Sequence, residues 1–132
     1  MQIHWGRVLL AGFLIEVILA VVLVGGFAAA GVQLESNISA SASTIIGLAC
    51  FVVAFVVVLW LGRGVESHIV LHGFLMGLVA TVLYVGLVAG AGQMPTALAA
   101  YGPATFVVVN AVRMVGAVLG GVVCERRRVV SV

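Results

Sequence analysis

Charge is scarce in this sequence. It contains no lysine and no aspartate, and its six arginines and four glutamates make up only 8% of the 132 residues. A soluble domain is about 25% charged, because charged side chains cover much of the surface that faces water. The composition therefore excludes an ordinary water-soluble domain and predicts a chain that lies in a membrane.

Cysteine is also rare, with two residues in the chain. Cys50 and Cys124 lie in or at the end of apolar runs, which is typical of small membrane residues and indicates neither a disulfide framework nor a metal site. No pattern of nucleophile and base predicts catalysis. The net charge of +2 does not indicate a nucleic-acid partner, since the arginines lie at the ends of apolar runs rather than on one polar face.

What the sequence does contain is four long apolar runs, at about 8–30, 44–61, 68–89 and 104–123. At about 1.5 Å per residue, each can cross a hydrocarbon core of about 30 Å as a helix. Backbone groups in hydrocarbon must bond within their own segment, and the runs are too continuous for barrel strands. We expect an all-α, integral membrane four-helix bundle that forms one domain over 1–132, with 31–43, 62–67 and 90–103 as connections.

The 8–30 run has features of a secretory signal, because Arg7 precedes it and the small residues "AAAG" (28–31) stand at its end. It is longer than the 7–15 apolar residues that are typical of such signals, so we expect it to remain as the first helix. Ser43 and Thr44 are expected to cap the next helix.

Four crossings place five arginines on one side of the membrane and none on the other. Short loops rich in arginine stay in the cytoplasm, so we expect both termini and the 62–67 turn to be cytoplasmic. These topology anchors are Arg7, Arg63, Arg126, Arg127 and Arg128.

An internal repeat relates two of the runs. Residues 9–31 align with 70–92 at an offset of 61, and both segments contain the triplet "GFL". We expect a duplicated helical hairpin with both copies in the same orientation, which implies a pseudo-twofold axis along the membrane normal.

Two opposite charges are predicted to lie deep in the membrane. Glu16 is about 13 Å from Arg7 along its helix, and Arg113 is about 15 Å from Val123, on the same side. Each charge costs about 2.5–3.5 kcal/mol to insert, so we expect the two to pair, with Asn110 one turn away. The alternatives are a partner on another subunit, lipid or cofactor, and a role in transport.

Glycines at small-xxx-small spacing predict close helix packing, since helices in lipid associate through close backbone approach. Such packing is expected within the bundle, with an oligomer or docking face as the alternative. The packing glycines are Gly12, Gly73, Gly77, Gly86, Gly90, Gly116 and Gly120.

His68 and His72 are four residues apart at the start of the third run. We expect both to bond to lipid headgroups or loop carbonyls. The alternative is that one of them, with His72 the deeper, ligates haem or chlorophyll.

Two segments carry a family resemblance. "LHGFLMGLVATVLY" (71–84) and "GAVLGG" (116–121) resemble the third and fourth helices of small bacterial four-helix membrane proteins of unknown function. Those helices have H-G-x-x-x-G-like and G-A-x-x-G-G-like patterns. The resemblance implies a four-helix layout in the bacterial inner membrane and no particular activity.

We therefore expect a non-catalytic accessory subunit that packs against a larger membrane complex, with no cofactor. Its partners would be the lipid bilayer and either other membrane subunits or further copies of itself. One alternative is a small oligomeric transporter or channel that uses Glu16 and Arg113. The single glutamate in "LIEVIL" (14–19), within the first apolar run, resembles the lone membrane glutamate in the first helix of small multidrug transporters. A further alternative is a pigment- or haem-binding subunit.

Overall fold

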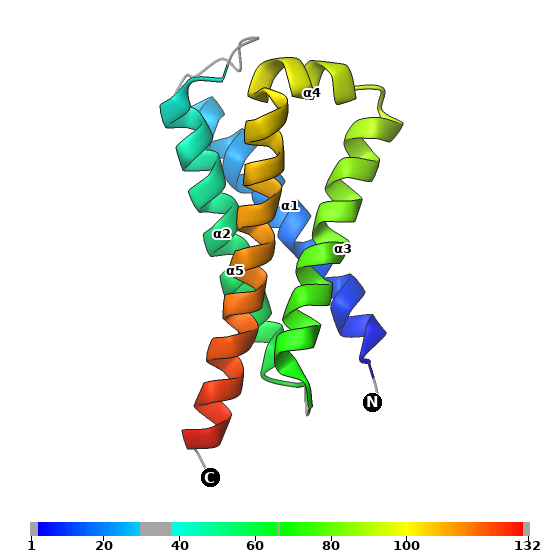
Figure 1. Cartoon of the computed structure of the whole chain (residues 1–132), viewed down its shortest axis with the longest axis vertical. Coiled ribbons are helices and arrows are strands. Elements are labelled where there is room, and N and C mark those ends of the chain that lie inside the picture. The colour runs from blue at the N-terminus through cyan, green and yellow to red at the C-terminus, as the bar shows by residue number, and fades with distance from the viewer. Residues whose placement is uncertain (1–2, 30–37, 66, 131–132) are drawn as a thin grey trace.

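The computed structural model describes residues 3–29, 38–65 and 67–130. Over these residues the chain forms five α-helices and no strand (Figure 1). They are α1 (Trp5–Ala29), α2 (Ala40–Gly62), α3 (Ile69–Gly90), α4 (Met94–Tyr101) and α5 (Pro103–Val130). All except α4 are long and apolar enough to cross a membrane, which confirms the prediction of an all-α fold with four membrane-compatible helices.

The four long helices run side by side and alternate in direction along the chain. In Figure 1, α1 and α3 rise while α2 and α5 descend, and α4 lies across one end between α3 and α5. The other end, here called the arginine end, holds the start of α1, the α2–α3 turn and the end of α5. All five predicted topology anchors lie at this end. Which side of a membrane the arginine end faces stays a prediction, as does the duplication.

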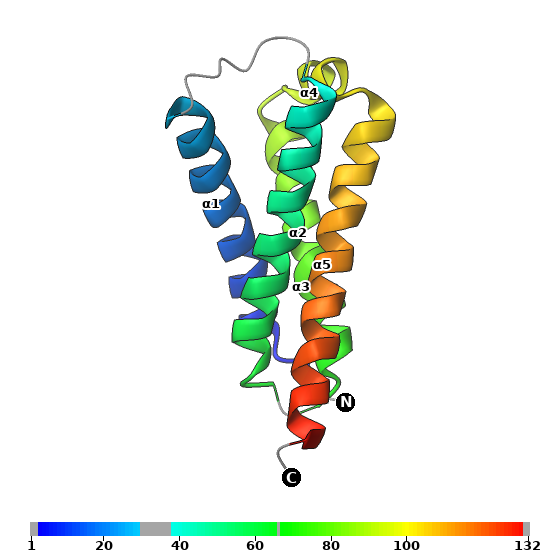
Figure 2. The same ribbon diagram turned by 90° about the vertical axis from the view of Figure 1, so that its left-hand side faces the viewer.

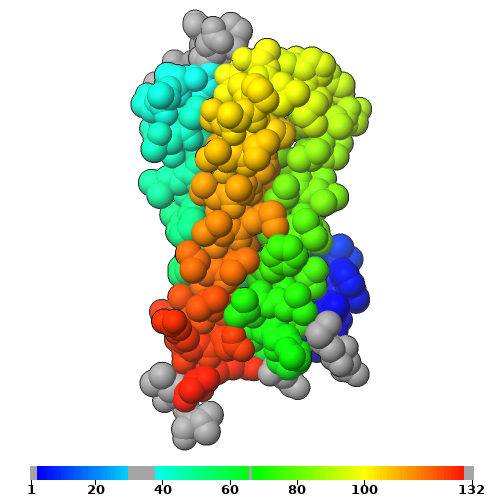
Figure 3. Space-filling model, viewed as in Figure 1, coloured from blue at the N-terminus to red at the C-terminus, as the bar shows by residue number. Residues whose placement is uncertain are grey.

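Helix α5 lies between α2 and α3 and makes most of its contacts with these two helices (Figure 3). Glycine allows this close approach. A Cβ built on Gly116 would lie 2.5 Å from the carbonyl oxygen of Phe51, and one on Gly73 would lie 2.7 Å from that of Ala117. Gly120 and Gly77 make similarly close contacts, with Phe55 and Ala117. These four glycines therefore set the spacing of three helices.

Helix α1 packs against α3 and α2 mainly through its first half. Its buried residues end at Leu19, and none of the residues from 20 to 29 is buried. Gly12 marks a close approach to α3, because a Cβ there would overlap the side chain of Val79. Figure 2 shows the second half of α1 leaning away from α2 towards the end that carries α4.

Two predicted glycine contacts are absent from the described residues. A Cβ built on Gly86 or Gly90 would have no neighbour within 4 Å, and both glycines are exposed. The packing prediction was wrong within this chain for these two positions, because α3 diverges from α1 beyond the contact at Gly12.

Several element boundaries also differ from the prediction. The 90–103 connection contains the helix α4, which begins with Pro95 in its first turn. Helix α5 continues past residue 123 through the arginine run to Val130. The sequence prediction followed hydropathy, which marks the apolar part of a helix rather than its ends. Ala30, the last residue of the first predicted segment, lies outside the described residues, as do residues 31–37 of the predicted connection.

The start of α2 also differs. Ser39 is its N-cap, and the hydroxyl of Ser39 accepts a hydrogen bond from the backbone N–H of Ala42 at 3.2 Å. Thr44 instead donates to the carbonyl oxygen of Ala40 at 2.9 Å. The predicted cap at Ser43 and Thr44 was wrong because polar residues before the apolar run already belong to the helix.

Candidate functional site

The side chain of Arg113 lies at the centre of the bundle and is only 3% exposed. Its Nη1 donates to Oε1 of Glu16 on α1 at 2.5 Å. Its Nη2 lies 3.8 Å from the Sγ of Cys50 on α2, and its Cζ lies 4.9 Å from the centre of the Tyr84 ring on α3. One side chain on α5 therefore contacts each of the other three long helices.

The contact with α1 spans the bundle. Helices α1 and α5 have almost no backbone contact with each other. Each packs against α2 and α3, which separate them. The long arginine side chain passes between Cys50 and Tyr84 to reach Glu16, which is 13% exposed. The structure thus brings together the two deep charges that the sequence singled out, and they join helices that do not otherwise pack.

The electrostatics favour this arrangement. An isolated charge is expensive to bury because it loses its hydrating water. When an arginine is paired with a carboxylate, contacts with the carboxylate replace much of that water. The face of the Tyr84 ring adds a cation–π attraction of about 0.5–2 kcal/mol. Together, Glu16, Cys50, Tyr84 and Arg113 form what we call the Arg113 cluster.

Asn110 lies next to this cluster, one turn before Arg113, and is 8% exposed. Its Nδ2 donates to the carbonyl oxygen of Phe106 on its own helix at 2.8 Å. Its Oδ1 has no hydrogen-bond partner among the described residues, and the same holds for Nε of Arg113 and Oγ1 of Thr81. Asn110 is therefore bonded along α5 and keeps one free acceptor.

Aromatic residues cover the cluster on the side of α4. The Tyr84 ring lies 5.9 Å from that of Phe106, and Phe106 meets Tyr101 of α4 edge-on at 6.4 Å. Burial is the main cause that raises the pKa of Tyr101 to about 12, so its hydroxyl is protonated at neutral pH. The cover is thus uncharged and ties α4 to the bundle.

His72 is fully buried, and both of its ring nitrogens are engaged. The backbone N–H of His4 donates to Nε2 at 3.1 Å, and Nδ1 donates to the carbonyl oxygen of His68 at 3.0 Å. This pattern fits the tautomer with its proton on Nδ1. A haem or chlorophyll could bond to Nε2 only by displacing the start of the chain.

His68 has a different role, as the N-cap of α3 with a left-handed backbone (φ 52°). It is exposed, and its carbonyl holds the His72 ring. Among the described residues, no group of three or more His, Cys, Asp or Glu side chains has the arrangement of a metal site.

The arginine end is held by further contacts. The guanidinium of Arg7 covers Gly64, where a Cβ would overlap it. Nη2 of Arg128 donates to the carbonyl oxygen of Arg63 at 3.4 Å, which joins the last turn of α5 to the end of α2. Arg126 and Arg127 are exposed.

Sequence reasoning missed two members of the Arg113 cluster, Cys50 and Tyr84. Their depth matches that of Arg113, but nothing in an apolar helix indicates which way each residue faces. A comparison of depths along all four runs would have placed both in the set of candidates.

Comparison of the chain with protein-family models, with curated proteins and with solved structures found no match. The function must therefore be inferred from the chain's own geometry.

Proposed function

We propose that this protein is a non-catalytic accessory subunit of a larger membrane assembly, with its arginine end in the cytoplasm of a bacterial cell. The observation that carries the proposal is that the Arg113 cluster is formed entirely by side chains of this chain. Arg113 meets Glu16, Cys50 and Tyr84, all from this chain. Its deep charges thus serve to hold four helices together.

The surface of the bundle supports an assembly role. Gly47 lines a groove of about 430 Å³ between α2 and α5, and no described residue lies within 4 Å of a Cβ built on it. The remaining lining is mostly apolar and includes Leu48, Phe51 and Val108. Small residues beside a groove allow a neighbouring helix to approach closely in lipid. We infer that a helix of another membrane protein packs in this groove.

The test replaces Gly47 with leucine, whose side chain should fill the groove from a position where a Cβ meets no described atom within 4 Å. The native protein is purified in mild detergent from the source cells and should retain defined partners at a fixed ratio. Gly47→Leu should lose those partners while its melting temperature as an isolated chain stays the same.

The matched control is Gly86→Leu, which makes the same change at an open glycine on α3 and should keep the partners. Purification of the native protein as a monomer without any partner would count against an accessory role. Loss of partners in Gly86→Leu alone would move the interface from the groove to α3.

A second candidate function is a small oligomeric transporter. The observation that favours it is the presence of three buried polar atoms without a partner among the described residues, on Thr81, Asn110 and Arg113. Such atoms can bind water or a passing ion. If they do, Thr81→Val should lower proton flux into proteoliposomes severalfold, because it removes a hydroxyl with little change in shape. Flux equal to that of empty liposomes, for the native protein and the variant alike, excludes proton transport.

A further inference from the structure

A pocket at the arginine end gathers positive charge. It has a volume of about 250 Å³ and lies between the end of α2 and the last turns of α5. Its lining residues are Leu59, Arg63, Cys124, Arg127 and Arg128. Three of the five are arginines, and no acidic residue lines the pocket within the described part of the chain.

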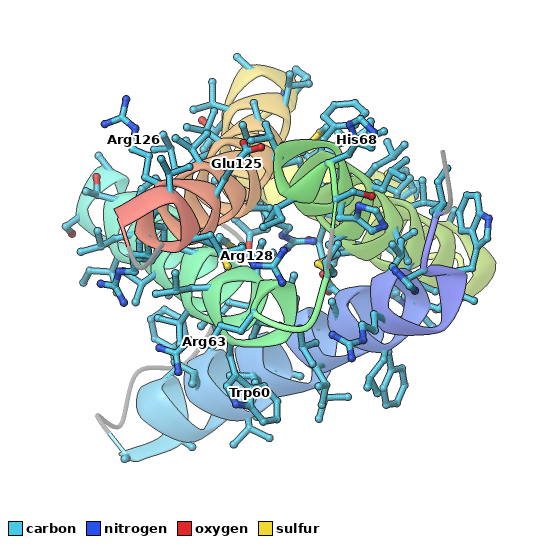
Figure 4. All side chains as sticks on the ribbon, turned by 90° about the horizontal axis from the view of Figure 1, so that it is seen from below. Trp60, Arg63, His68, Glu125, Arg126 and Arg128 are labelled. Carbon is cyan, nitrogen blue, oxygen red and sulfur yellow. The ribbon has the colours of Figure 1, made fainter. Side chains whose placement is uncertain are left out.

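The arginines are placed by two different helices. Arg63 is the C-cap of α2, and Arg127 lies in the last turn of α5. The hydrogen bond from Arg128 to the carbonyl oxygen of Arg63 holds these two elements together. Figure 4, which looks along the bundle from this end, places Glu125 on the other side of α5 from Arg63. The described acidic residue of this helix thus points away from the pocket.

The charges exceed what the helix ends require. The C-terminus of a helix carries about half a negative charge, and two helices end at this pocket. The guanidinium groups of Arg63 and Arg127 carry two positive charges against about one negative charge from the two helix ends, so they leave the pocket positive. A guanidinium presents parallel N–H groups that match two oxygens of a phosphate, so two arginines from different helices can clasp one such group.

The surroundings favour a lipid as the source of that phosphate. Helix α2 has 23 residues, which is about 35 Å of helix against a hydrocarbon core of about 30 Å, so Arg63 lies at the level of the headgroups. Trp60, which is 63% exposed, stands one turn before it, and indole rings settle at this interface. Leu59 and Cys124 give the pocket an apolar floor that faces the acyl region.

We propose that this pocket binds the phosphate group of an anionic phospholipid, with Arg63 and Arg127 as its ligands. The site would hold the protein at a fixed depth and orientation relative to the cytoplasmic leaflet. This inference does not depend on the proposed accessory role.

The experiment uses the purified full chain in phosphatidylcholine nanodiscs that contain an increasing fraction of phosphatidylglycerol. Native mass spectrometry counts the phosphatidylglycerol that stays bound on release from the disc. Arg127→Gln should lower the retained phosphatidylglycerol about tenfold, and Arg63→Gln should do the same. Arg126→Gln is the matched control, because it removes the same charge from the neighbouring position, which does not line the pocket.

The results distinguish a specific lipid site from diffuse attraction to anionic lipid and from a site for free phosphate. Equal losses in Arg126→Gln and Arg127→Gln would overturn the proposal, since they would show a diffuse attraction to anionic lipid. Displacement of the lipid by millimolar inorganic phosphate or glycerol phosphate would show that the pocket takes a free phosphate instead. Unchanged melting temperatures of the variants in pure phosphatidylcholine establish that the losses reflect binding and not unfolding.

Discussion

Glu16→Gln should be the most destabilising single change in the Arg113 cluster, with a loss of about 3–5 kcal/mol in the free energy of unfolding. Without the carboxylate, Arg113 keeps its full charge at the centre of the bundle, because arginine does not lose its proton in proteins. The Tyr84 ring offsets only part of this cost, about 0.5–2 kcal/mol. Reversible unfolding in mixed detergent micelles measures the loss.

The opposite change should cost less. Arg113→Met fills much of the same volume, and the carboxyl group of Glu16 that it leaves unpaired can become neutral by taking up a proton. We expect Arg113→Met to lose about 1–3 kcal/mol, and the double variant Glu16→Gln with Arg113→Met to recover most of the loss of Glu16→Gln. The sign of this double-mutant cycle is the informative result.

The control for this series is Tyr84→Phe, which keeps the ring that faces Arg113 and removes only a hydroxyl. It should change the free energy of unfolding by less than about 0.5 kcal/mol. Additive losses in the double variant would contradict the pairing of Glu16 with Arg113. A loss in Glu16→Gln no larger than in Tyr84→Phe would contradict the view that the pair joins α1 to the bundle.

The pair could be predicted from the sequence because depth in a membrane is a one-dimensional quantity. Counting residues from the ends of two apolar runs placed Glu16 and Arg113 at similar depth, and their cost in hydrocarbon required a partner. The direction in which each residue faces was not available in this way. In a soluble protein the polar face of a helix is exposed, so the opposite, apolar face can be identified as buried. The helices α1, α2 and α3 are apolar on all sides and give no such signal. Cys50 and Tyr84 were therefore missed.

The same limit explains the mixed result for the glycines. Spacing alone treats Gly73 and Gly77 like Gly86 and Gly90, since both pairs are four residues apart on one helix. In the structure the first pair meets α5, and the second pair has open space around it. The two pairs lie on different faces of α3, because Gly86 follows Gly77 by nine residues, which is about two and a half turns. Gly86 and Gly90 lie on the face that meets Gly12 of α1 at Val79, but α1 has diverged from α3 at their level. How far α1 follows α3 depends on the tilt of the two helices, which the spacing of glycines does not give.

Gly116→Ala should be the most damaging methyl addition in the bundle. Its Cβ would lie 2.5 Å from the carbonyl oxygen of Phe51 and 3.1 Å from two further backbone atoms of that residue. Backbone atoms of α2 cannot rotate away, so α2 and α5 must separate along their shared length. Overpacking of this kind costs about 1–3 kcal/mol and more where the backbone must move, so we expect a loss of at least about 3 kcal/mol. Unfolding in detergent micelles measures it.

Gly47→Ala is the matched control for this prediction. It makes the same change on the helix that α5 meets, at a position where a Cβ has no neighbour within 4 Å in the described part of the chain. Both variants gain the same helix propensity, about 0.5–1 kcal/mol, so the difference between them isolates the contact. Gly47→Ala should be neutral or slightly stabilising. Equal stability of the two variants would mean that α2 and α5 do not approach each other at Gly116, and the path of Arg113 past Cys50 would then lose its geometric basis.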